Sequence, residues 1–432
     1  MHLQLDAILL VILLFSSLFN DNITFGFSLF GVIRVRRSNK ISIRFIPEIT
    51  LEDASHSPRD ESYRKWAKDY NHQKSILMRM PQMEEGAVTF EIDGAFYNPK
   101  MKLNREICVA MAAALDLGEY LDALSASGIR GMRVAREAGV RRVTLNDVSP
   151  RAHELIMKNL GRNGLECEAT CRNANALMHE RRFQAVDLDP FGSPSPFLAA
   201  ASRSALSYLF VTATDTAPLC GAHLNSGIRK YLARPLRTDY HREMGARILL
   251  GLSARELARL DKGMEPLLTH VTDHYVRVYL RVRKGAKAAD DCLSGMGYVE
   301  HCPSCGCFVT RKGPEPEGNC SHCQARTILA GPLWLGKIQA KETILTAMQR
   351  LDEGCRARRL LEICAAEEDV PMYYDHHSIC ERLNITPGRI DDVVQRLRDR
   401  GHRASRTHFC GLGIKTDAPL VQVEEASKAR DP

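Results

Sequence analysis

Residues 187–194 carry the side chains that chemistry on an exocyclic amine requires. They read Asp-Leu-Asp-Pro-Phe-Gly-Ser-Pro and follow a short apolar run that we expect to be a buried strand. Pro190 fixes its own backbone and keeps Asp189 out of helical geometry. A carboxylate held there can accept a hydrogen bond from the amine and stabilise the charge that develops on it. We therefore interpret Asp189 as catalytic rather than as a strand-ending Asp-Pro turn, with Phe191 stacking on the base. We expect Asp187 to point away from this site.

Three further loops suit a nucleoside cofactor that ends in an amino acid. Around Gly128 the backbone can approach a ligand at a helix N-terminus, and Arg130 can pair with a carboxylate. Asp147 ends the next expected strand, where it can accept hydrogen bonds from a ribose diol. Asn173 and Ala174 follow the third strand, beside the expected adenine. Each residue alone is an ordinary loop residue, but the ordered set predicts S-adenosylmethionine. The absence of G-x-G-x-x-G disfavours a nicotinamide cofactor.

These residues are embedded in a regular alternation of strands and helices. Expected strands cover residues 119–124, 142–146, 167–171, 184–188 and 208–213, and expected helices cover 131–138, 150–163 and 194–207. Such alternation predicts a parallel α/β sheet covered on both faces. The apolar–polar pattern of residues 273–284 predicts an antiparallel, half-exposed strand. Residues 83–285 are thus expected to form one α/β, Rossmann-like domain.

Two pairs of cysteines predict a metal centre. Cys302 and Cys305 form one C-x-x-C pair, and Cys320 and Cys323 form a second pair after 14 intervening residues. This spacing is typical of a closed tetrahedral zinc site with a structural role. Cys307 could compete as a ligand. The alternative, a loop of free exposed thiols, is disfavoured because such thiols are a liability.

The C-terminal domain, residues 286–432, contains this zinc loop (302–323) and a winged-helix-like α+β region (370–425). Residues 378–383 and 388–400 read as helix-turn-helix, followed by expected strands over 402–409 and 413–423. Several arginines cluster there: Arg389, Arg396, Arg398, Arg400, Arg403 and Arg406. They are a candidate surface for a nucleic-acid backbone. A solvated helix face explains the first of them equally well, because aspartates are interspersed among them.

Composition bounds the class of protein only loosely. A chain of 432 residues suggests roughly two or three domains. The net charge of +7 fits a polyanionic partner without establishing one. Fourteen cysteines in so long a chain point to a reducing, cytoplasmic compartment rather than to a disulfide scaffold.

Residues 1–82 do not match the rest of the chain. The apolar run over residues 7–19 is shorter than the roughly 20 residues of a membrane span and lacks a basic segment before it. A weak anchor or signal and a disordered leader are two interpretations. We favour a third, a non-native extension ahead of a true start at Met78, Met80 or Met83. No stable membrane partner is expected.

The chain resembles the archaeal tRNA (guanine-26-N2)-dimethyltransferase family. The segments that carry the resemblance are 96–106, 121–133, 145–149, 187–197, 211–223, 373–379 and 407–419. They lie in the family's order and span nearly everything beyond residue 83. The resemblance implies that residues 83–285 have the class I, Rossmann-like fold of a methyltransferase domain. It also implies S-adenosylmethionine as cofactor, tRNA as partner and N2,N2-dimethylguanosine as product. We expect a monomer or weak dimer.

The resemblance also implies roles for particular residues. Asp189 would be the catalytic carboxylate, and Phe96 and Phe191 would sandwich the target guanine. Arg105 would join Arg130 and Asp147 in contacting the cofactor, whose adenine Asn173 and Ala174 would border. The family commonly carries Asp where this chain has Asn173. Not every member carries the two cysteine pairs.

Two other functions stay open at the level of sequence. One is an amino-methyltransferase that acts on ribosomal guanine or on DNA adenine, since such enzymes use similar Asp/Asn-Pro-aromatic loops. The other is a nucleic-acid-binding regulator built on the winged helix and the zinc loop. That alternative leaves residues 187–194 unexplained and predicts no cofactor binding.

Overall fold

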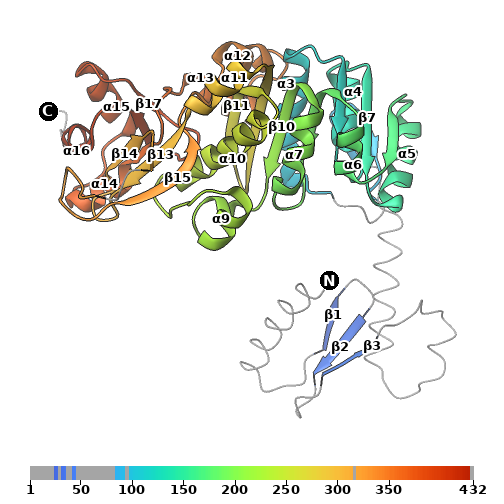
Figure 1. Ribbon diagram of the computed structural model, residues 1–432, viewed down its shortest axis with the longest axis horizontal. Helices are drawn as coiled ribbons and strands as arrows, with labels where there is room; N and C mark the ends of the chain where they lie inside the picture. Colours follow the sequence, from blue (N-terminus) through green and yellow to red (C-terminus); the bar gives the residue numbers. More distant parts are fainter. Residues whose placement is uncertain are drawn as a thin grey trace. The chain divides into compact units, whose positions relative to one another are not determined.

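The computed structural model describes residues 24–27, 31–35, 41–44, 83–92, 97–314 and 318–428 (Figure 1). The chain divides into two units, Met1–Pro81 and Gln82–Pro432. In the first unit β1 (Thr24–Phe27), β2 (Gly31–Val35) and β3 (Ile41–Arg44) form an antiparallel sheet. Within the described ranges, no helix has the length and apolar character needed to cross a membrane. That residues 1–82 are a non-native or disordered extension stays a prediction.

A seven-stranded sheet forms the centre of the second unit. Its strands are β6 (Glu119–Asp122), β7 (Arg142–Asp147), β8 (Glu168–Cys171), β9 (Phe183–Leu188), β10 (Ala205–Ala213), β11 (Lys262–Thr272) and β12 (Tyr275–Lys284). They lie in the order β11-β12-β10-β9-β6-β7-β8. The five from β10 to β8 are parallel, and β12 is antiparallel to both neighbours. The order reverses between β6 and β9, and open α/β sheets bind ligands outside the carboxyl ends at such a point.

Helices cover both faces of this sheet, as the alternation predicted. One core includes side chains from α3 (Lys102–Ala114), α4 (Ile129–Glu137) and α5 (Pro150–Asn163). The other includes side chains from α6 (Ala174–Glu180), α7 (Ser195–Ser204), α10 (His241–Ala258) and α11 (Ala286–Ser294). Helix α5 begins at Pro150, and Ser149 caps it by accepting the Ala152 N–H at 3.4 Å. Before them, β4 (Met83–Glu85) and β5 (Val88–Phe90) form a hairpin.

Strand β12 corrects one expectation. Residues 273–284 do hold an antiparallel strand, but the prediction that it is half-exposed is wrong. Residues 275–280 are buried throughout, because β10 and β11 flank the strand and helices cover it. Its alternating arginines therefore include a fully buried one, Arg277.

The rest of the chain forms two smaller sheets with helices around them. Strands β13 (Met296–His301), β14 (Phe308–Arg311) and β15 (Ile328–Trp334) are antiparallel in the order β14-β13-β15. Beyond α12 and α13, the winged-helix-like part comprises β16 (Tyr374–Asp375), α14 (His376–Leu383), α15 (Ile390–Asp399), β17 (Ala404–Arg406), β18 (Gly413–Thr416) and α16 (Leu420–Lys428). The expected strand over 413–423 is shorter than predicted, because helix α16 begins at Leu420.

The chain returns to the large sheet after β15. Helices α12 (Lys341–Met348) and α13 (Arg356–Ala366) pack against α3 and share its core. Likewise, α10 of the large sheet packs on β15. The domain boundary predicted between residues 285 and 286 is thus crossed by continuous cores, and its position stays a prediction.

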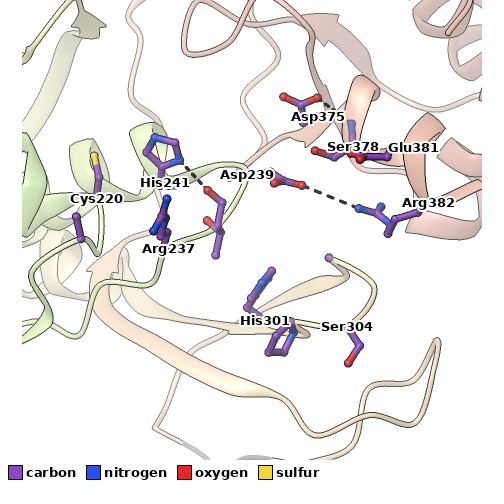
Figure 2. Close-up of a pocket in the computed structure, with 14 residues that line it drawn as sticks. Cys220, Arg237, Asp239, His241, His301, Ser304, Asp375, Ser378, Glu381 and Arg382 are labelled. Atoms are coloured by element: carbon purple, nitrogen blue, oxygen red, sulfur yellow. Dashed lines mark hydrogen bonds and ion pairs between the residues drawn. The ribbon is translucent and has the colours of Figure 1, made fainter.

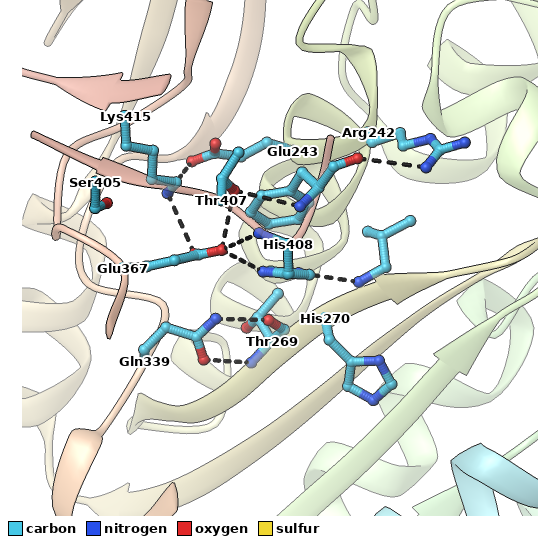
Figure 3. Close-up of polar contacts among 12 residues, drawn as sticks. Arg242, Glu243, Thr269, His270, Gln339, Glu367, Ser405, Thr407, His408 and Lys415 are labelled. Carbon is cyan, nitrogen blue, oxygen red and sulfur yellow. Dashed lines mark hydrogen bonds and ion pairs between the residues drawn. The ribbon is translucent and has the colours of Figure 1, made fainter. Parts of the chain in front are cut away.

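A buried polar cluster adds to this junction (Figure 3). Lys415 of β18 donates to Glu243 of α10 at 2.9 Å and lies 3.8 Å from Glu367. Glu367 accepts from His408 Nδ1 at 2.5 Å, and His408 Nε2 accepts the Val271 N–H of β11 at 3.2 Å. The C-terminal elements are therefore fixed against the sheet by ionic contacts as well as by apolar packing.

Candidate active site and metal centre

The loop after β9 presents Asp189 at the carboxyl edge of the sheet. Its carboxylate pairs with the guanidinium of Arg130. The loop turns at Gly192, where φ is +77°, and Gly192 donates its N–H to Thr214 Oγ1 at 2.7 Å. Thr214 follows β10, so the next strand along holds the far end of the loop. Between these anchors the side chain of Phe191 is 73% exposed.

Arg130 connects the loop of residues 187–194 to the buried side chains beneath it. It lies in the first turn of α4, is buried, and donates to Asn104 Oδ1 at 2.8 Å. Its guanidinium also lies 3.9 Å from the carboxylate of Asp187. The expectation that Asp187 points away from Asp189 is wrong, because side chains two residues apart along a strand share a face. Both carboxylates therefore face the same arginine.

Asp187 is the centre of a fully buried charge network below the loop. Arg277 of β12 donates to its two oxygens at 2.6 and 2.7 Å, and the Tyr120 hydroxyl donates to it as well. Burial raises the pKa of Asp187, but Arg277 and Arg130 outweigh burial and hold it at about 2. Sequence reasoning missed Arg277 and Tyr120. The two-residue spacing of Asp187 and Asp189 was the signal in the sequence that both side chains lie on one face of the strand.

The loop after β6 is shaped by carboxylates that bind backbone N–H groups. Asp122 accepts the Gly131 N–H at 3.1 Å at the start of α4. Burial raises its pKa to about 7 against the opposing charge of Arg130, and the nearby carboxylates of Asp187 and Asp189 add to the rise. Gly128 takes a φ of +81°, which a glycine tolerates where other residues do not. The start of α4 is buried beneath this loop.

Asp147 and Asn173 come together at the ends of β7 and β8. Asp147 accepts the N–H groups of Ala126 at 3.0 Å and Ser149 at 2.9 Å, so it spans the first two loops. Its own backbone oxygen accepts the Arg172 N–H at 3.1 Å. Asn173 caps α6 by accepting the Ala176 N–H at 3.2 Å, and the neighbouring Ala174 is buried. The structure thus gathers the carboxyl ends of the first three parallel strands, as expected.

Two other expected site residues, Arg105 and Phe96, are not brought to Asp189 by the described part of the chain. Arg105 forms a buried ion pair with Glu85, its Nε lying 2.6 Å from the carboxylate, and Glu85 also binds Arg133 at 2.8 Å. Burial raises the pKa of Glu85, but Arg105 and Arg133 hold it at about 2. Phe96 lies outside the described residues. The structure therefore brings Arg130 to Asp189 and places Arg105 against Glu85.

The four predicted metal-ligating cysteines do converge. Their Sγ atoms all lie within 4.8 Å of one another, at 3.4 Å for Cys302–Cys323 and 3.6 Å for Cys305–Cys320. A tetrahedral zinc ion with bonds of about 2.3 Å would separate its sulfurs by about 3.8 Å. In each C-x-x-C turn the next residue has positive φ, +74° and +61°, and returns its N–H to the first cysteine's carbonyl at 2.9 Å. The two turns match each other and fit zinc.

A separate hollow of about 950 Å³ lies where the large sheet's connections meet the cysteine loop and α14 (Figure 2). It is lined by Arg237, Asp239 and His241 on one side and by His301 and Arg382 on the other. Asp239 lies 4.0 Å from Arg382 across it. None of the residues that line it belongs to the loop of residues 187–194.

Comparison with known proteins places this site in a family. The model of the N2,N2-dimethylguanosine tRNA methyltransferase family matches residues 78–428. A tRNA (guanine(26)-N(2))-dimethyltransferase of Methanosarcina mazei is 50% identical over 351 residues, covering 76% of this chain and 90% of the relative. A protein of the same name from Methanosphaerula palustris is 42% identical over 82% of this chain and its own full length.

A solved structure supports the same assignment. Trm1 from Pyrococcus horikoshii in complex with S-adenosyl-L-methionine is 37% identical, with a TM-score of 0.75 over 81% of this chain and 100% of that chain. The resemblance found in the sequence and the class I methyltransferase fold are both confirmed. The chain belongs to the N2,N2-dimethylguanosine tRNA methyltransferase family.

Proposed function

We propose that this chain transfers methyl groups from S-adenosylmethionine to the exocyclic N2 of guanine 26 in tRNA, giving N2-methyl- and then N2,N2-dimethylguanosine. The names of its relatives support the substrate and the position. One observation in this chain supports the chemistry, the Asp189 carboxylate held by Arg130 at the carboxyl edge of the sheet beside the first loop. There it can meet an amine brought to the cofactor.

In this proposal Asp189 orients the nucleophile. S-adenosylmethionine supplies an electrophilic methyl group on its sulfonium. The guanine amine is a weak nucleophile because its lone pair is delocalised into the ring. Asp189 accepts a hydrogen bond from this amine and stabilises its developing positive charge. Arg130 keeps Asp189 in position, and Phe191, exposed at the loop's tip, stacks on the base.

The cofactor residues are a proposal on the same footing. The N-terminus of α4 suits the cofactor's carboxylate, and Asp147 suits its ribose. Asn173 and Ala174 border the adenine from the end of β8, where Asn173 is already oriented as a helix cap. Arg105 reaches the cofactor only if its pairing with Glu85 leaves a donor available. Replacing Asp147 with Asn should weaken cofactor binding more than tRNA binding.

Zinc is proposed as a structural ion on Cys302, Cys305, Cys320 and Cys323. The grouping of the four sulfurs within 4.8 Å of one another supports it. Cys307 lies in the same turn, and its carbonyl accepts the Cys302 N–H at 2.8 Å. A cytoplasmic location and a monomer or weak dimer stay predictions.

We propose that fewer of the C-terminal arginines contact tRNA than the sequence suggested. Arg398 donates to the Ala404 carbonyl at 2.8 Å, and Arg403 pairs with Asp417 at 3.0 Å. These side chains hold their own domain together. Arg389 is exposed before α15 and suits phosphate contact better.

The test is methyl transfer to an unmodified tRNA transcript. The full chain is incubated with labelled S-adenosylmethionine, and the RNA is digested to nucleosides. We expect label in N2-methyl- and N2,N2-dimethylguanosine, lost when guanine 26 is changed to adenine. Asp189→Asn should lower kcat at least about 100-fold, the scale of general acid–base catalysis. Asp290→Asn, an exposed aspartate of α11, is the matched control.

Other outcomes separate the alternatives. Label in another nucleoside, or with ribosomal RNA or DNA only, would overturn the substrate and keep the methyltransferase. No label with any nucleic acid, together with no cofactor binding, would support the regulator.

A further inference from the structure

Helix α9 (Leu224–Tyr231) carries an exposed apolar stripe. Leu224 and Ile228 on the helix and Leu232 just after it are 40%, 43% and 57% exposed. Leu224 and Ile228, four residues apart, lie on one face of the helix and begin a row, to which the C-cap residue Leu232 adds a third exposed apolar side chain. Within the described part of the chain, no other segment covers this row. A clustered apolar surface of this kind marks an interaction site more often than single exposed residues do.

The face of α9 that adjoins the stripe is packed against the rest of the chain, and this packing fixes how the helix is oriented. Gly227 lies so close to the Pro218 carbonyl and the Pro235 ring that an added Cβ would come within 2.7 Å of each. Tyr231 is fully buried, and its hydroxyl donates to Asp215. The outward direction of the three side chains is therefore built into the packing of the helix.

The same helix is bound directly to residues 187–194, the proposed catalytic loop. The Ser193 hydroxyl, four residues after Asp189, lies 3.0 Å from the Tyr231 hydroxyl. Lys230 pairs with Asp215, in the segment that follows β10, at 3.0 Å. The stripe thus stands beside the loop that must receive the target base.

Leu232 is held in a costly conformation. Its φ is +51°, a left-handed geometry that non-glycine residues seldom adopt and that is enriched at functional sites. Arg255 of α10 stabilises the turn by donating to the carbonyls of Leu232 at 3.0 Å and Tyr231 at 2.9 Å. Leucine here presents an exposed apolar side chain where glycine would remove the strain.

The charge around the stripe indicates the partner. Arg229 and Lys230 are exposed on the same helix, and Arg237 is exposed just beyond it. Apolar side chains flanked by cations suit a nucleic acid whose bases are open and whose phosphates lie alongside.

We propose that the α9 stripe contacts bases of the substrate tRNA next to the target guanine and keeps that guanine unstacked in the catalytic loop. Enzymes that act on a stacked base must extrude it, and apolar side chains inserted at base steps stabilise the opened state. This inference rests on the proposed function, because it assumes that a guanine within folded tRNA is the substrate. It assigns Leu224, Ile228 and Leu232 as positioning residues for the reaction.

The experiment compares the double variant Leu224→Ala/Ile228→Ala with the full wild-type chain. The matched control is Leu345→Ala, a leucine of α12 that is somewhat more exposed, at 52%. The first readout is kcat/KM on folded tRNA and on a short RNA with the target guanine in a bulge. The second is the fluorescence of tRNA carrying 2-aminopurine at the target position, which rises when that base unstacks.

The double variant should lose about tenfold or more in kcat/KM on folded tRNA, because the two substitutions remove apolar surface that would be buried against the bases. It should show little fluorescence rise at saturating protein, keep its affinity for S-adenosylmethionine, and recover on the bulged RNA. Leu345→Ala should behave as wild type. Leu232→Gly should melt at a higher temperature, because strain is relieved, yet should also lose activity on folded tRNA.

Several results would overturn the inference. Wild-type activity and fluorescence in the double variant would do so, as would an equal loss on folded and bulged RNA. A wild-type dimer that the double variant converts to monomer would assign the stripe to a subunit interface instead. If the wild-type chain forms no methylguanosine in tRNA, the proposed function itself fails, and that result is read from the wild type alone.

Discussion

The carboxylates of this site are arranged in two levels that share Arg130. Asp189 is partly accessible and pairs with one side of the guanidinium, while Asp187 is fully buried 3.9 Å from the other. A second arginine, Arg277, neutralises Asp187. Because the lower carboxylate is satisfied by Arg277, Arg130 can be directed at Asp189. The Asp189 carboxylate is thus held by a buried arginine, beneath which a second ion pair is buried.

Asp187→Asn tests how much the buried ion pair of Asp187 contributes to stability. It leaves Arg277 buried with a neutral partner, and removing one member of a buried pair costs about 3–5 kcal/mol. Urea unfolding should show this loss in the free energy of unfolding, with less than about 0.5 kcal/mol for Asp290→Asn. Because the pKa of Asp187 in the folded protein is about 2, below its ordinary value, its contribution is present above about pH 4 and declines as pH falls toward 2. Equal stability of the two variants at pH 7 would contradict the network.

Asp122→Asn makes a prediction of opposite sign. The folded pKa of Asp122 is about 7, above its ordinary value of 3.8, so the folded state binds a proton that the unfolded state has lost. Stability from this group therefore falls as pH rises from about 4 to about 7 and is constant above. Asparagine can still accept the Gly131 N–H. The variant, without cofactor, should gain melting temperature relative to wild type between pH 5 and pH 8. A gap that is constant with pH would count against a protonated Asp122.

At the scale of elements, the sequence predicts the features that depend on a local pattern of residues. Helix α5 follows from Ser149 and Pro150, and the cysteine centre follows from the spacing of Cys302 to Cys323. The burial of β12 could not be predicted, because it depends on strand order. Strand order in turn decides that Arg277 meets Asp187, 90 residues away. The alternation of apolar and polar residues alone predicts that such an arginine is exposed.

The cysteine centre should decide whether the C-terminal elements fold. Cys302, Cys305 and Cys320 belong to the same apolar core as Ile379 of α14 and Leu397 of α15. Removing the ion, or Cys320→Ser, should therefore lower hydrogen-exchange protection in α14–α16 while the large sheet keeps its protection and binds S-adenosylmethionine. Chelation should release about one zinc ion per chain.

Cys167→Ser, in a half-buried thiol outside the cluster, is the control and should change neither property. Full protection in α14–α16 after complete metal removal would show that the thiols are not a folding site. Zinc bound by the Cys320→Ser variant with unchanged stoichiometry and affinity would point to Cys307 as a ligand.

At the scale of the molecule, the C-terminal elements and the large sheet form a continuous structure within Gln82–Pro432. Helices α12 and α13 return to pack on α3, and the cluster around Glu367 and Lys415 fixes β18 against α10. A tRNA bound at the C-terminal elements would thus be held at a set distance from Asp189. The sequence suggested separable domains, because helix and strand patterns do not reveal which distant segments share a core.

Glu367→Gln tests this rigid connection. The Glu367 carboxylate accepts from Thr407, from the His408 backbone and from the His408 ring. Burial raises its pKa, but His408 and Lys415 outweigh burial and hold it at about 2. Glutamine removes the charge that faces His408 and Lys415, but Lys415 keeps its ion pair with Glu243, so the expected cost is about 1–3 kcal/mol. Wild-type stability from Glu367 should be present above about pH 4.5 and decline toward pH 2, and the variant should lack this slope.

An activity measurement on Glu367→Gln distinguishes a cluster that positions the tRNA from one that only stabilises the fold. Below its melting temperature, Glu367→Gln should bind S-adenosylmethionine as wild type does, because Arg130 and Asp147 are untouched. Its kcat/KM for tRNA should fall, because the C-terminal elements are less firmly held against the sheet. Glu362→Gln, an exposed residue of α13 that pairs with Arg358 along the helix, should leave both unchanged. If Glu367→Gln lost stability yet kept full kcat/KM for tRNA, the cluster would stabilise the fold without positioning the RNA.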